Sequence, residues 1–279
     1  MGRQGLESDP YWLGSTDSEL ARLERQAELL GPATDRLLRA AGIGAGMRVL
    51  DVGSGVGDVA LIAGDLVGPA GRVLGIDRDE KSVTTAAARA EALGARGVGF
   101  TTADLDIYVT DTPFDAVIGR LVLMYSPDPL ASIRHLARLV RSGGVVAFLE
   151  GTGTDDMETA WHHWPDTPLL ADVLSWFGAC YRAANVQTKI GLRLPSWMRA
   201  AGLEPQPIGD ATAIVVEGHA AAEYTAACVR SMLPLILANG IATAEQVDID
   251  TLSQRLLAAG EDDLVLTVGT FTSVWARRP

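Results

Sequence analysis

A cluster of glycines stands where a run of apolar residues gives way to a helical pattern, at Asp51-Val52-Gly53-Ser54-Gly55-Val56-Gly57. Glycine lets the backbone turn tightly and approach a ligand closely, and the helix that follows offers free N–H groups and the positive end of its dipole. A second acid, Asp77, ends the next apolar run, 20 residues after Gly57. A carboxylate there can accept hydrogen bonds from both ribose hydroxyls of an adenosine ligand. Together these features predict a site for an adenosine-containing ligand.

The glycine spacing distinguishes between two kinds of ligand. Dinucleotide-binding loops carry their third glycine one place later, in the pattern G-x-G-x-x-G, whereas this chain has G-x-G-x-G with Asp51 two residues before Gly53. Buried carboxylates without partners are costly, so Asp51 and Asp77, at the ends of two apolar runs, have no evident role in a core. Another Rossmann-like nucleotide site, such as that of an NAD-dependent oxidoreductase, stays open as an alternative. A non-catalytic protein that binds its cofactor without turnover is the other.

Strand and helix patterns alternate from residue 46 to residue 150 and would bring these groups together. Short apolar runs predict strands, and the segments with helical spacing between them predict helices. Strands separated by helices imply a mostly parallel sheet that is covered on both faces. The strands are expected at residues 48–52, 72–77, 98–102, 114–120 and 145–150, with helices that end near 67 and span 80–93 and 129–140.

The two ends of the chain follow other patterns. Before the first strand, helical spacing predicts two helices, at residues 16–30 and 33–41. After residue 150 the alternation breaks, and we interpret 151–200 and 219–260 as insertions on one sheet, so that residues 1–279 form a single domain. Helices are expected over most of 151–200 and twice within 220–259, and strands at 213–217 and 264–275.

Composition excludes several classes of protein. With 48% apolar and 21% charged residues, the chain is typical of globular proteins. A net charge of -12 argues against binding of nucleic acid, because that depends on Lys and Arg that neutralise phosphates. Cys180 and Cys228 are expected to be buried thiols, and no Cys/His spacing suits a metal site. The first ten residues lack an apolar signal region and 220–244 makes a poor membrane span, so we expect a cytoplasmic protein without a membrane partner.

Further motifs follow the glycine cluster in order along the chain. Asp77 ends the second strand, Ala103-Asp104-Leu105 follows the third, 114–120 forms the fourth, and Arg141-Ser142-Gly143-Gly144 precedes the fifth. This series resembles the class I S-adenosylmethionine-dependent methyltransferases of the bacterial small-molecule (secondary-metabolism) type, with Ser142 in place of the usual Pro. The resemblance implies an α/β fold with a Rossmann-like seven-stranded sheet. That sheet would be mostly parallel with an antiparallel last strand, with helices on both faces and helical lid insertions.

The resemblance also implies S-adenosylmethionine as the cofactor, without a metal. Asp77 would hold the ribose and Asp104 the adenine amino group. Residues 1–45 would cover the cofactor, 46–150 would bind it, and the insertions 151–200 and 219–260 would form a lid over the substrate. Gln26 ends a version of the family's R-L-x-x-Q, and it either reaches the methionine end or stays solvated. The residues expected to bind the cofactor are Gln26, Asp51, Gly53, Gly55, Gly57, Asp77, Arg78, Ala103, Asp104, Leu105, Arg120 and Leu121.

Aromatic residues gather in 161–197, which indicates a flat, apolar acceptor or a small core of the lid itself. They are Trp161, Trp164, Trp176, Phe177, Tyr181 and Trp197. Four residues are candidates for orienting the acceptor or taking its proton: His162, His163, Tyr125 and Glu150. The resemblance extends to enzymes that methylate indole carbon, and phenolic oxygen and amine nitrogen stay open as acceptor atoms. A homodimer is an oligomeric state that the sequence allows.

Overall fold

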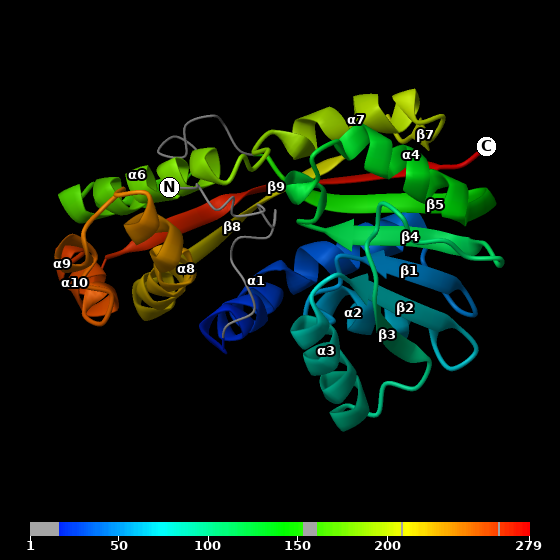
Figure 1. The fold of residues 1–279 in the computed structure, drawn as a ribbon, viewed down its shortest axis with the longest axis horizontal. Helices are drawn as coiled ribbons and strands as arrows, with labels where there is room; N and C mark the ends of the chain where they lie inside the picture. The colour runs from blue at the N-terminus through cyan, green and yellow to red at the C-terminus, as the bar shows by residue number, and fades with distance from the viewer. Residues whose placement is uncertain (1–16, 153–160, 208, 262) are drawn as a thin grey trace, which may run out of the picture.

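One twisted sheet with helices on both faces organises the computed structural model of this chain (Figure 1). The structure describes residues 17–152, 161–207, 209–261 and 263–279. The strands are β1 (Arg48–Val52), β2 (Arg72–Asp77), β3 (Val98–Thr102), β4 (Phe114–Arg120), β5 (Val140–Gly151), β6 (His163–Trp164), β7 (Glu204–Pro205), β8 (Asp210–Glu217) and β9 (Val265–Arg277). The helices are α1 (Asp17–Ala41), α2 (Asp58–Val67), α3 (Glu80–Ala92), η1 (Leu123–Tyr125), α4 (Pro129–Leu139), α6 (Pro168–Ala183), α7 (Ile190–Ala200), α8 (Gly218–Ala238), α9 (Ala244–Val247) and α10 (Leu252–Ala259).

The strands in the described part of the chain occupy seven positions across the sheet, although nine strands are present. Strand order runs β3-β2-β1-β4-β5-β9, and β9 has partners along both of its edges. On one edge β5 pairs with residues 271–277 and β6 continues at 265–266. On the other edge β7 pairs at 276–277 and β8 at 265–273. The predicted seven-stranded arrangement is therefore confirmed, with the short strands β6 and β7 as additions to it.

Strand directions also follow the prediction. The first five strands pair in parallel, and β9 is antiparallel to β5 and to β8. In such a sheet the carboxyl ends of the parallel strands meet at one edge, where open α/β folds bind their ligands. The loops after β1, β2, β3 and β4 all leave the sheet at that edge.

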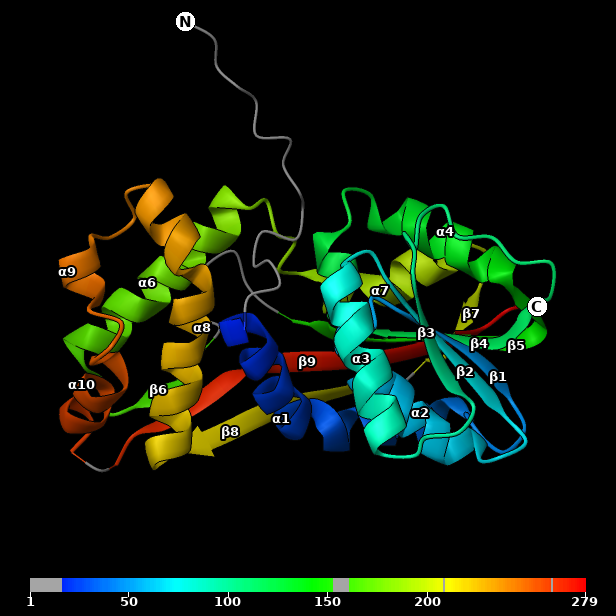
Figure 2. The same cartoon turned by 60° about the horizontal axis from the view of Figure 1, so that its bottom comes forward.

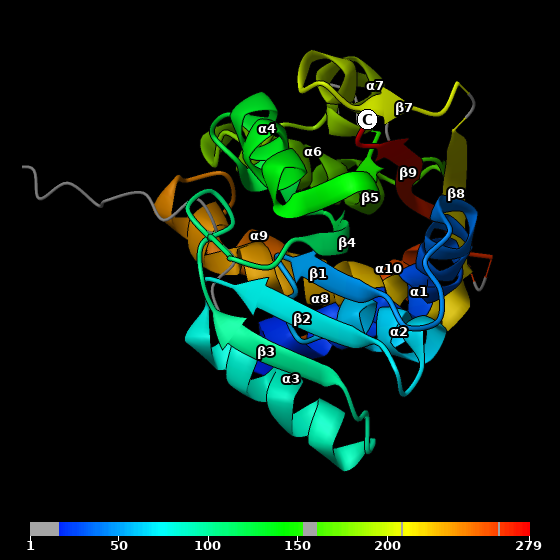
Figure 3. The same ribbon diagram turned by 90° about the vertical axis from the view of Figure 1, so that its right-hand side faces the viewer.

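Helices bury both faces of the sheet, as Figure 3 shows. Side chains alternate along a strand, so Val145, Ala147 and Leu149 of β5 join an apolar cluster with α1 and α2. Val146 and Phe148 point to the opposite face and pack with α4 and α7. The continuous apolar run of β5 is thus a consequence of burial on both sides.

A separate lobe forms around α6, α8 and α10 beside the first half of β9 (Figure 2). Its apolar core contains Leu174 and Phe177 from α6, Val229 from α8 and Leu256 from α10. Helix α7 falls within the predicted insertion 151–200 but packs on the sheet next to α4 instead. The lobe therefore consists of residues 161–183 and 218–260 with the adjoining part of β9.

Helix α1 is a single helix of 25 residues, so the prediction of two helices at 16–30 and 33–41 is wrong. Pro32 lies inside it, where proline normally costs about 3 kcal/mol. Leu30, Ala33 and Leu37 around it are at most 4% exposed. The helix continues because burial of this apolar face outweighs the missing backbone hydrogen bond.

No helix in the described residues is both long and apolar enough to cross a bilayer.

Candidate functional site

Two adjoining cavities lie at the carboxyl ends of the parallel strands. The first cavity runs from the loops after β1, β2, β3 and β4 to α1, and the second continues from it into the lobe. The residues that line both are Arg22, Gln26, Leu121 and Tyr125. Ten of the residues predicted to bind the cofactor line the first cavity: Gln26, Gly53, Gly55, Asp77, Arg78, Ala103, Asp104, Leu105, Arg120 and Leu121.

The glycine loop forms one wall of the first cavity. Its turn is closed by hydrogen bonds from Ser54 N to Ile76 O (3.0 Å) and from Gly57 N to Ser54 O (2.9 Å). A Cβ at Gly53 would lie 2.3 Å from Val122 Cγ2, whereas one at Gly55 would meet no atom within 4 Å. Gly53 therefore allows two loops to pack together, and Gly55 leaves the cavity wall open to a ligand.

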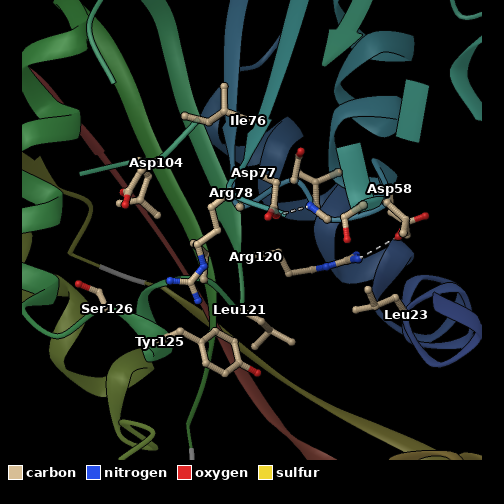
Figure 4. A pocket seen from close by; sticks show the side chains of 18 of the residues that line it. Leu23, Asp58, Ile76, Asp77, Arg78, Asp104, Arg120, Leu121, Tyr125 and Ser126 are labelled. Carbon is tan, nitrogen blue, oxygen red and sulfur yellow. Dashed lines mark hydrogen bonds and ion pairs between the residues drawn. The ribbon is translucent and has the colours of Figure 1, made fainter. Parts of the chain in front are cut away.

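Asp77 ends β2 and faces the glycine loop, as Figure 4 shows. Its two carboxylate oxygens accept hydrogen bonds from Gly55 N (2.8 Å) and Asp79 N (2.9 Å). Burial raises the pKa of Asp77, and these two bonds oppose the shift. Each oxygen keeps a further lone pair, so the carboxylate can still accept from a ligand's hydroxyls.

The far end of the first cavity suits a flat ring. Ile76, Ala103 and Leu105 provide apolar surface there, and Arg78 extends its side chain into the cavity (Figure 4). Asp104 is exposed and accepts a hydrogen bond from Asp106 N (2.8 Å). Its carboxylate is available at the rim to accept from an amino group.

Arg120 places a buried cation near the glycine loop. Its side chain is 8% exposed and lies 3.8 Å (Nη2) from Asp58 Oδ2, a carboxylate that also pairs with Arg89 at 2.7 Å. Burial lowers the pKa of Arg120, and the charges of Asp58 and Asp51 oppose this. An anionic group of a ligand in the first cavity could pair with this guanidinium.

Two predicted residues lie behind the loop instead of at the cavity surface. Asp51 is fully buried, and neither of its oxygens has a hydrogen-bond partner in the described residues. Burial raises its pKa well above the ordinary value. Gly57 does not line the cavity either, since its Cα faces the ring of Phe100, 2.8 Å from where a Cβ would be. Neither residue lines the first cavity, and Gly57 is required where the loop packs against Phe100.

Tyr125 lines both cavities, and Glu150 fixes the turn that carries it. Glu150 is fully buried and its Oε1 accepts from Val122 N (2.9 Å) and Leu123 N (2.8 Å). Leu121 in the same turn has a left-handed φ of 52°. Burial raises the pKa of Glu150 to about 7 although these bonds lower it. Glu150 lines neither cavity, so the structure gives this predicted catalytic residue a positioning role.

The two predicted catalytic histidines are not brought to the cavities. His162 is exposed, and its backbone N–H donates to Thr267 Oγ1 (2.8 Å). His163 belongs to β6, with its Nδ1 3.4 Å from Pro165 O and 3.6 Å from Asp166 Oδ1. Neither ring lines the first or the second cavity. Both are held against β9, His162 through Thr267 and His163 through the β6–β9 pairing, and a two-residue strand leaves no sequence signal for this.

Aromatic side chains line the second cavity. Trp161 and Phe177 meet edge to face with ring centroids 5.2 Å apart, and Tyr181 and Tyr224 complete the wall. The other predicted aromatics do not reach it: Trp176 is in the lobe core, Trp164 is 64% exposed and Trp197 packs beneath Arg193. The second cavity can therefore enclose a planar apolar molecule.

Arg22 is a site residue that the sequence reasoning missed. It lies on α1, lines both cavities and is 7% exposed. Glu19, one turn earlier, is fully buried and binds the guanidinium through two hydrogen bonds of 2.8 and 2.6 Å. The R-L-x-x-Q segment contained the signal, because its Arg and Gln are four residues apart and share one helix face.

Sequence comparison gives matches over the part of the chain that holds the first cavity. A family model described as "Methyltransferase domain" matches residues 43–190. An arsenite methyltransferase of Aquipseudomonas alcaligenes is 32% identical over 111 residues, which are 37% of this chain and 32% of that protein. A 2-phytyl-1,4-naphtoquinone methyltransferase of Synechococcus elongatus is 35% identical over 127 residues, 45% of this chain and 50% of that protein. The chain thus spans a third to a half of the length of these relatives.

Solved structures share the fold across most of the chain. The YcgJ protein of Bacillus subtilis superposes with a TM-score of 0.61 and 17% identity, covering 89% of this chain and 99% of that one. A SAM-dependent methyltransferase from Aquifex aeolicus gives a TM-score of 0.54 and 16% identity over 95% of this chain and all of that one. The family match covers more than half of the 279 residues, over the glycine loop and the acids that follow it. The chain belongs to the class I S-adenosylmethionine-dependent methyltransferases.

Proposed function

We propose that this protein transfers a methyl group from S-adenosylmethionine to a small aromatic acceptor. The observation that carries the proposal is the pair of adjoining cavities, which share a wall formed by Arg22, Gln26, Leu121 and Tyr125. One cavity has the groups that an adenosyl amino acid needs, and the other has aromatic walls. A group at their junction can be passed from one to the other.

The residues of the first cavity fit S-adenosylmethionine. Asp77 would accept from the ribose hydroxyls and Asp104 from the adenine amino group, with Ile76 and Leu105 against the ring. Arg120 would pair with the methionine carboxylate, and the open position at Gly55 admits the chain of the ligand. When bound, the sulfonium compound supplies an activated methyl group.

The protein's contribution to the reaction is mainly positioning. Holding a nucleophile in line with the methyl carbon can contribute about 7–11 kcal/mol. Leu121 and Tyr125 stand at the junction and would orient the acceptor, and Glu150 holds their turn in place. The buried walls of the second cavity would exclude water from the acceptor.

An aromatic acceptor is supported by the lining of the second cavity. Trp161, Phe177, Tyr181 and Tyr224 provide flat surfaces from α6, α8 and the segment before β6. The naphtoquinone methyltransferase and a demethylmenaquinone methyltransferase of Staphylococcus aureus carry names of flat ring systems, whereas the arsenite methyltransferase does not. The choice of an aromatic acceptor therefore depends on the walls of the second cavity, and the two quinone names agree with it.

Replacement of Asp77 tests the assignment of the first cavity. Asp77→Ala removes the acceptor for the ribose hydroxyls, and affinity for S-adenosylhomocysteine should fall about 30-fold or more, which corresponds to about 2 kcal/mol. Isothermal titration calorimetry measures this, with Asp65→Ala, an exposed acid on α2, as the control variant. Unchanged affinity in Asp77→Ala, or binding of NAD in preference, would contradict the proposal.

A further inference from the structure

The wall between the two cavities carries a fixed charge. Of the four described residues that line both cavities, Arg22 alone is charged, and the other three are Gln26, Leu121 and Tyr125. The place where the methyl group would cross is therefore next to a guanidinium. Arg120 lines only the first cavity, so the two arginines serve different parts of the site.

Glu19 orients the guanidinium of Arg22 toward the cavities. The Nε of Arg22 donates to Glu19 Oε2 (2.8 Å) and Nη2 donates to Oε1 (2.6 Å), so the two planar groups face each other. Glu19 is fully buried and lines neither cavity. The positive end of this ion pair therefore points to the shared wall and the negative end points away from it.

The side chains around the second cavity show the effect of this orientation. Burial raises the pKa of four weak acids that line it, Tyr125, Tyr181, Tyr224 and Cys228. The charge of Arg22 lowers the pKa of each, and at Tyr125, Tyr181 and Cys228 it does so more strongly than Glu19 raises it. Burial outweighs Arg22 at all four, whose pKa values stay above the ordinary ones, so the ion pair makes the second cavity less unfavourable to a negative charge than burial alone would.

Building on the proposed methyl transfer, we propose that the acceptor is a hydroxyarene that binds in the second cavity as its oxygen anion, beside Arg22. The aromatic walls at Trp161 and Phe177 hold the ring, and the guanidinium selects the ionised hydroxyl. An opposite charge at this range lowers the pKa of such an acid by about 1–3 units. An amine or a neutral indole would gain positive charge as it attacked, and the same guanidinium would oppose that.

The bond changes balance without a further reactant. The hydroxyl proton leaves to solvent when the acceptor binds. A lone pair of the resulting oxygen anion forms the new C–O bond to the methyl carbon while the C–S bond breaks and its electron pair stays on sulfur. The products are a neutral aryl methyl ether and a neutral thioether. Arg22 then has no anion to retain, which favours product release.

The test uses 4-nitrophenol as the probe, because its ionised form absorbs visible light and reports its own pKa. The full chain is saturated with S-adenosylhomocysteine, 4-nitrophenol is bound, and its absorbance is followed against pH. Because its oxygen would contact the Arg22 guanidinium directly, the pKa of the bound phenol should fall by about one unit in spite of burial, equal to a tenfold shift in its ionisation. The control probe 4-nitroaniline has the same shape without an acidic oxygen and should bind at least tenfold more weakly.

Three variants assign the effect to Arg22. Glu19→Gln removes the opposing charge, so the pKa of the bound phenol should fall further. Arg22→Lys keeps the cation and should retain most of the shift. The double variant Glu19→Gln/Arg22→Gln keeps a neutral hydrogen-bonded pair and should lose the shift. Far-UV circular dichroism and thermal unfolding of each variant report whether its fold is intact.

The outcomes separate this inference from the proposed function. If the wild-type chain binds no S-adenosylhomocysteine, the proposed function fails. If it binds S-adenosylhomocysteine but 4-nitrophenol fails to bind, shows no lowered pKa or binds no better than 4-nitroaniline, the inference on the acceptor is overturned. If the double variant loses S-adenosylhomocysteine binding and wild-type 4-nitrophenol is unshifted, Arg22 pairs with the methionine carboxylate, which also overturns it.

Discussion

Glu150 connects two strands at the edge of the site through hydrogen bonds to a single turn. Its carboxylate ends β5, and Val122 and Leu123, just after β4, donate to one of its oxygens. These two hydrogen bonds satisfy backbone donors that burial would otherwise leave without a partner. They hold a turn that contains Leu121 with φ at 52°, a conformation that non-glycine residues rarely adopt. Tyr125, which lines both cavities, is placed by this turn.

The raised pKa of Glu150 predicts a pH dependence of stability. Burial raises the pKa from its ordinary value of 4.5 to about 7, so between these values the folded state binds a proton that the unfolded state releases. The contribution of Glu150 to the free energy of unfolding is therefore greatest below pH 4.5 and falls by about 3 kcal/mol as the pH rises through 7. Glu150→Gln should remove this slope, as urea unfolding at pH 4.5 to 8 would measure.

A matched comparison makes this prediction specific. Gln keeps an oxygen that can accept from Val122 and Leu123, so Glu150→Gln should be at least as stable as the wild type at pH 8. Glu150→Ala leaves both N–H groups without that acceptor and should be less stable at every pH. Parallel pH profiles for the wild type and Glu150→Gln would show that Glu150 does not titrate in this way.

The sequence predicts the role of a residue where a motif determines both its position in the fold and the residues that surround it. Asp77 and Gly55 lie in consecutive strand-to-helix connections, so their contact followed from the order of the strands. Glu150 was correctly placed at the end of a strand, but its role depends on which side chain turns inward. Adjacent His162 and His163 suggest a general base by side-chain chemistry alone, and nothing in the sequence shows that contacts with β9 keep both away from the cavities.

At the scale of elements, the loops after β1 and β4 are packed against each other without space to spare. Gly53 has φ at 65°, and a Cβ there would lie 2.3 Å from the side chain of Val122. Gly55 has a similar φ of 50° but open space in place of a neighbour. Gly53 is therefore required by close packing as well as by its φ, whereas Gly55 is required by its φ alone.

Replacing Gly53 and Gly55 by alanine, one at a time, should separate the effect on stability from the effect on ligand binding. Gly53→Ala combines left-handed backbone strain with a clash and should lower the free energy of unfolding by about 3 kcal/mol. Gly55→Ala adds backbone strain without a clash and should lower the free energy of unfolding by only about 1 kcal/mol. Its Cβ would project into the first cavity, so this variant should lose more affinity for S-adenosylhomocysteine than stability. Urea unfolding and calorimetry measure the two effects.

A second substitution checks the cause. Val122→Ala should recover part of the stability lost in Gly53→Ala, since it removes the atoms that a Cβ at position 53 would meet. It should recover nothing in Gly55→Ala. Equal loss of stability in the two single variants, or additive behaviour of Gly53→Ala with Val122→Ala, would rule out this account.

The sequence predicts helices and strands correctly where apolar residues recur with a clear spacing and where the segments that pack together are near each other in the chain. Strands β1 to β4 lie where their apolar runs predicted, because each is bounded by glycine or a polar turn. Pro32 suggested a helix boundary that tertiary packing overrides. Helix α7 has an ordinary amphipathic pattern, which does not say whether its apolar face meets the lobe or the sheet.

At the scale of the whole molecule, the sheet carries an apolar cluster on each of its faces, and the lobe has a separate core of its own. The sheet buries Leu136 of α4 completely, and the lobe buries Leu256 of α10 to the same degree. The first cavity is built by the loops of the sheet, and the second takes most of its wall from the lobe. Cofactor binding and acceptor binding should therefore depend on different cores.

Truncation of one leucine in each core tests this division. Leu256→Ala and Leu136→Ala should each cost about 2–5 kcal/mol of local stability. Leu256→Ala should speed hydrogen exchange in residues 161–183 and 218–260 while S-adenosylhomocysteine binds as in the wild type. Leu136→Ala should weaken that binding. If both variants speed exchange uniformly over the chain, the two cores form one cooperative unit.

The position of strand β9 in the sheet affects how the protein folds during its synthesis. It follows the other eight described strands along the chain, yet it lies between β5 and β8 and reaches from the lobe along the sheet (Figure 1). On the ribosome, every other strand emerges before the one that must join them, and the open edges of β5 and β8 stay exposed until residues 265–277 appear. Contacts this distant in sequence slow folding, and unpaired edges invite aggregation. The open edges of β5 and β8 should therefore favour aggregation until β9 is synthesised and pairs with both.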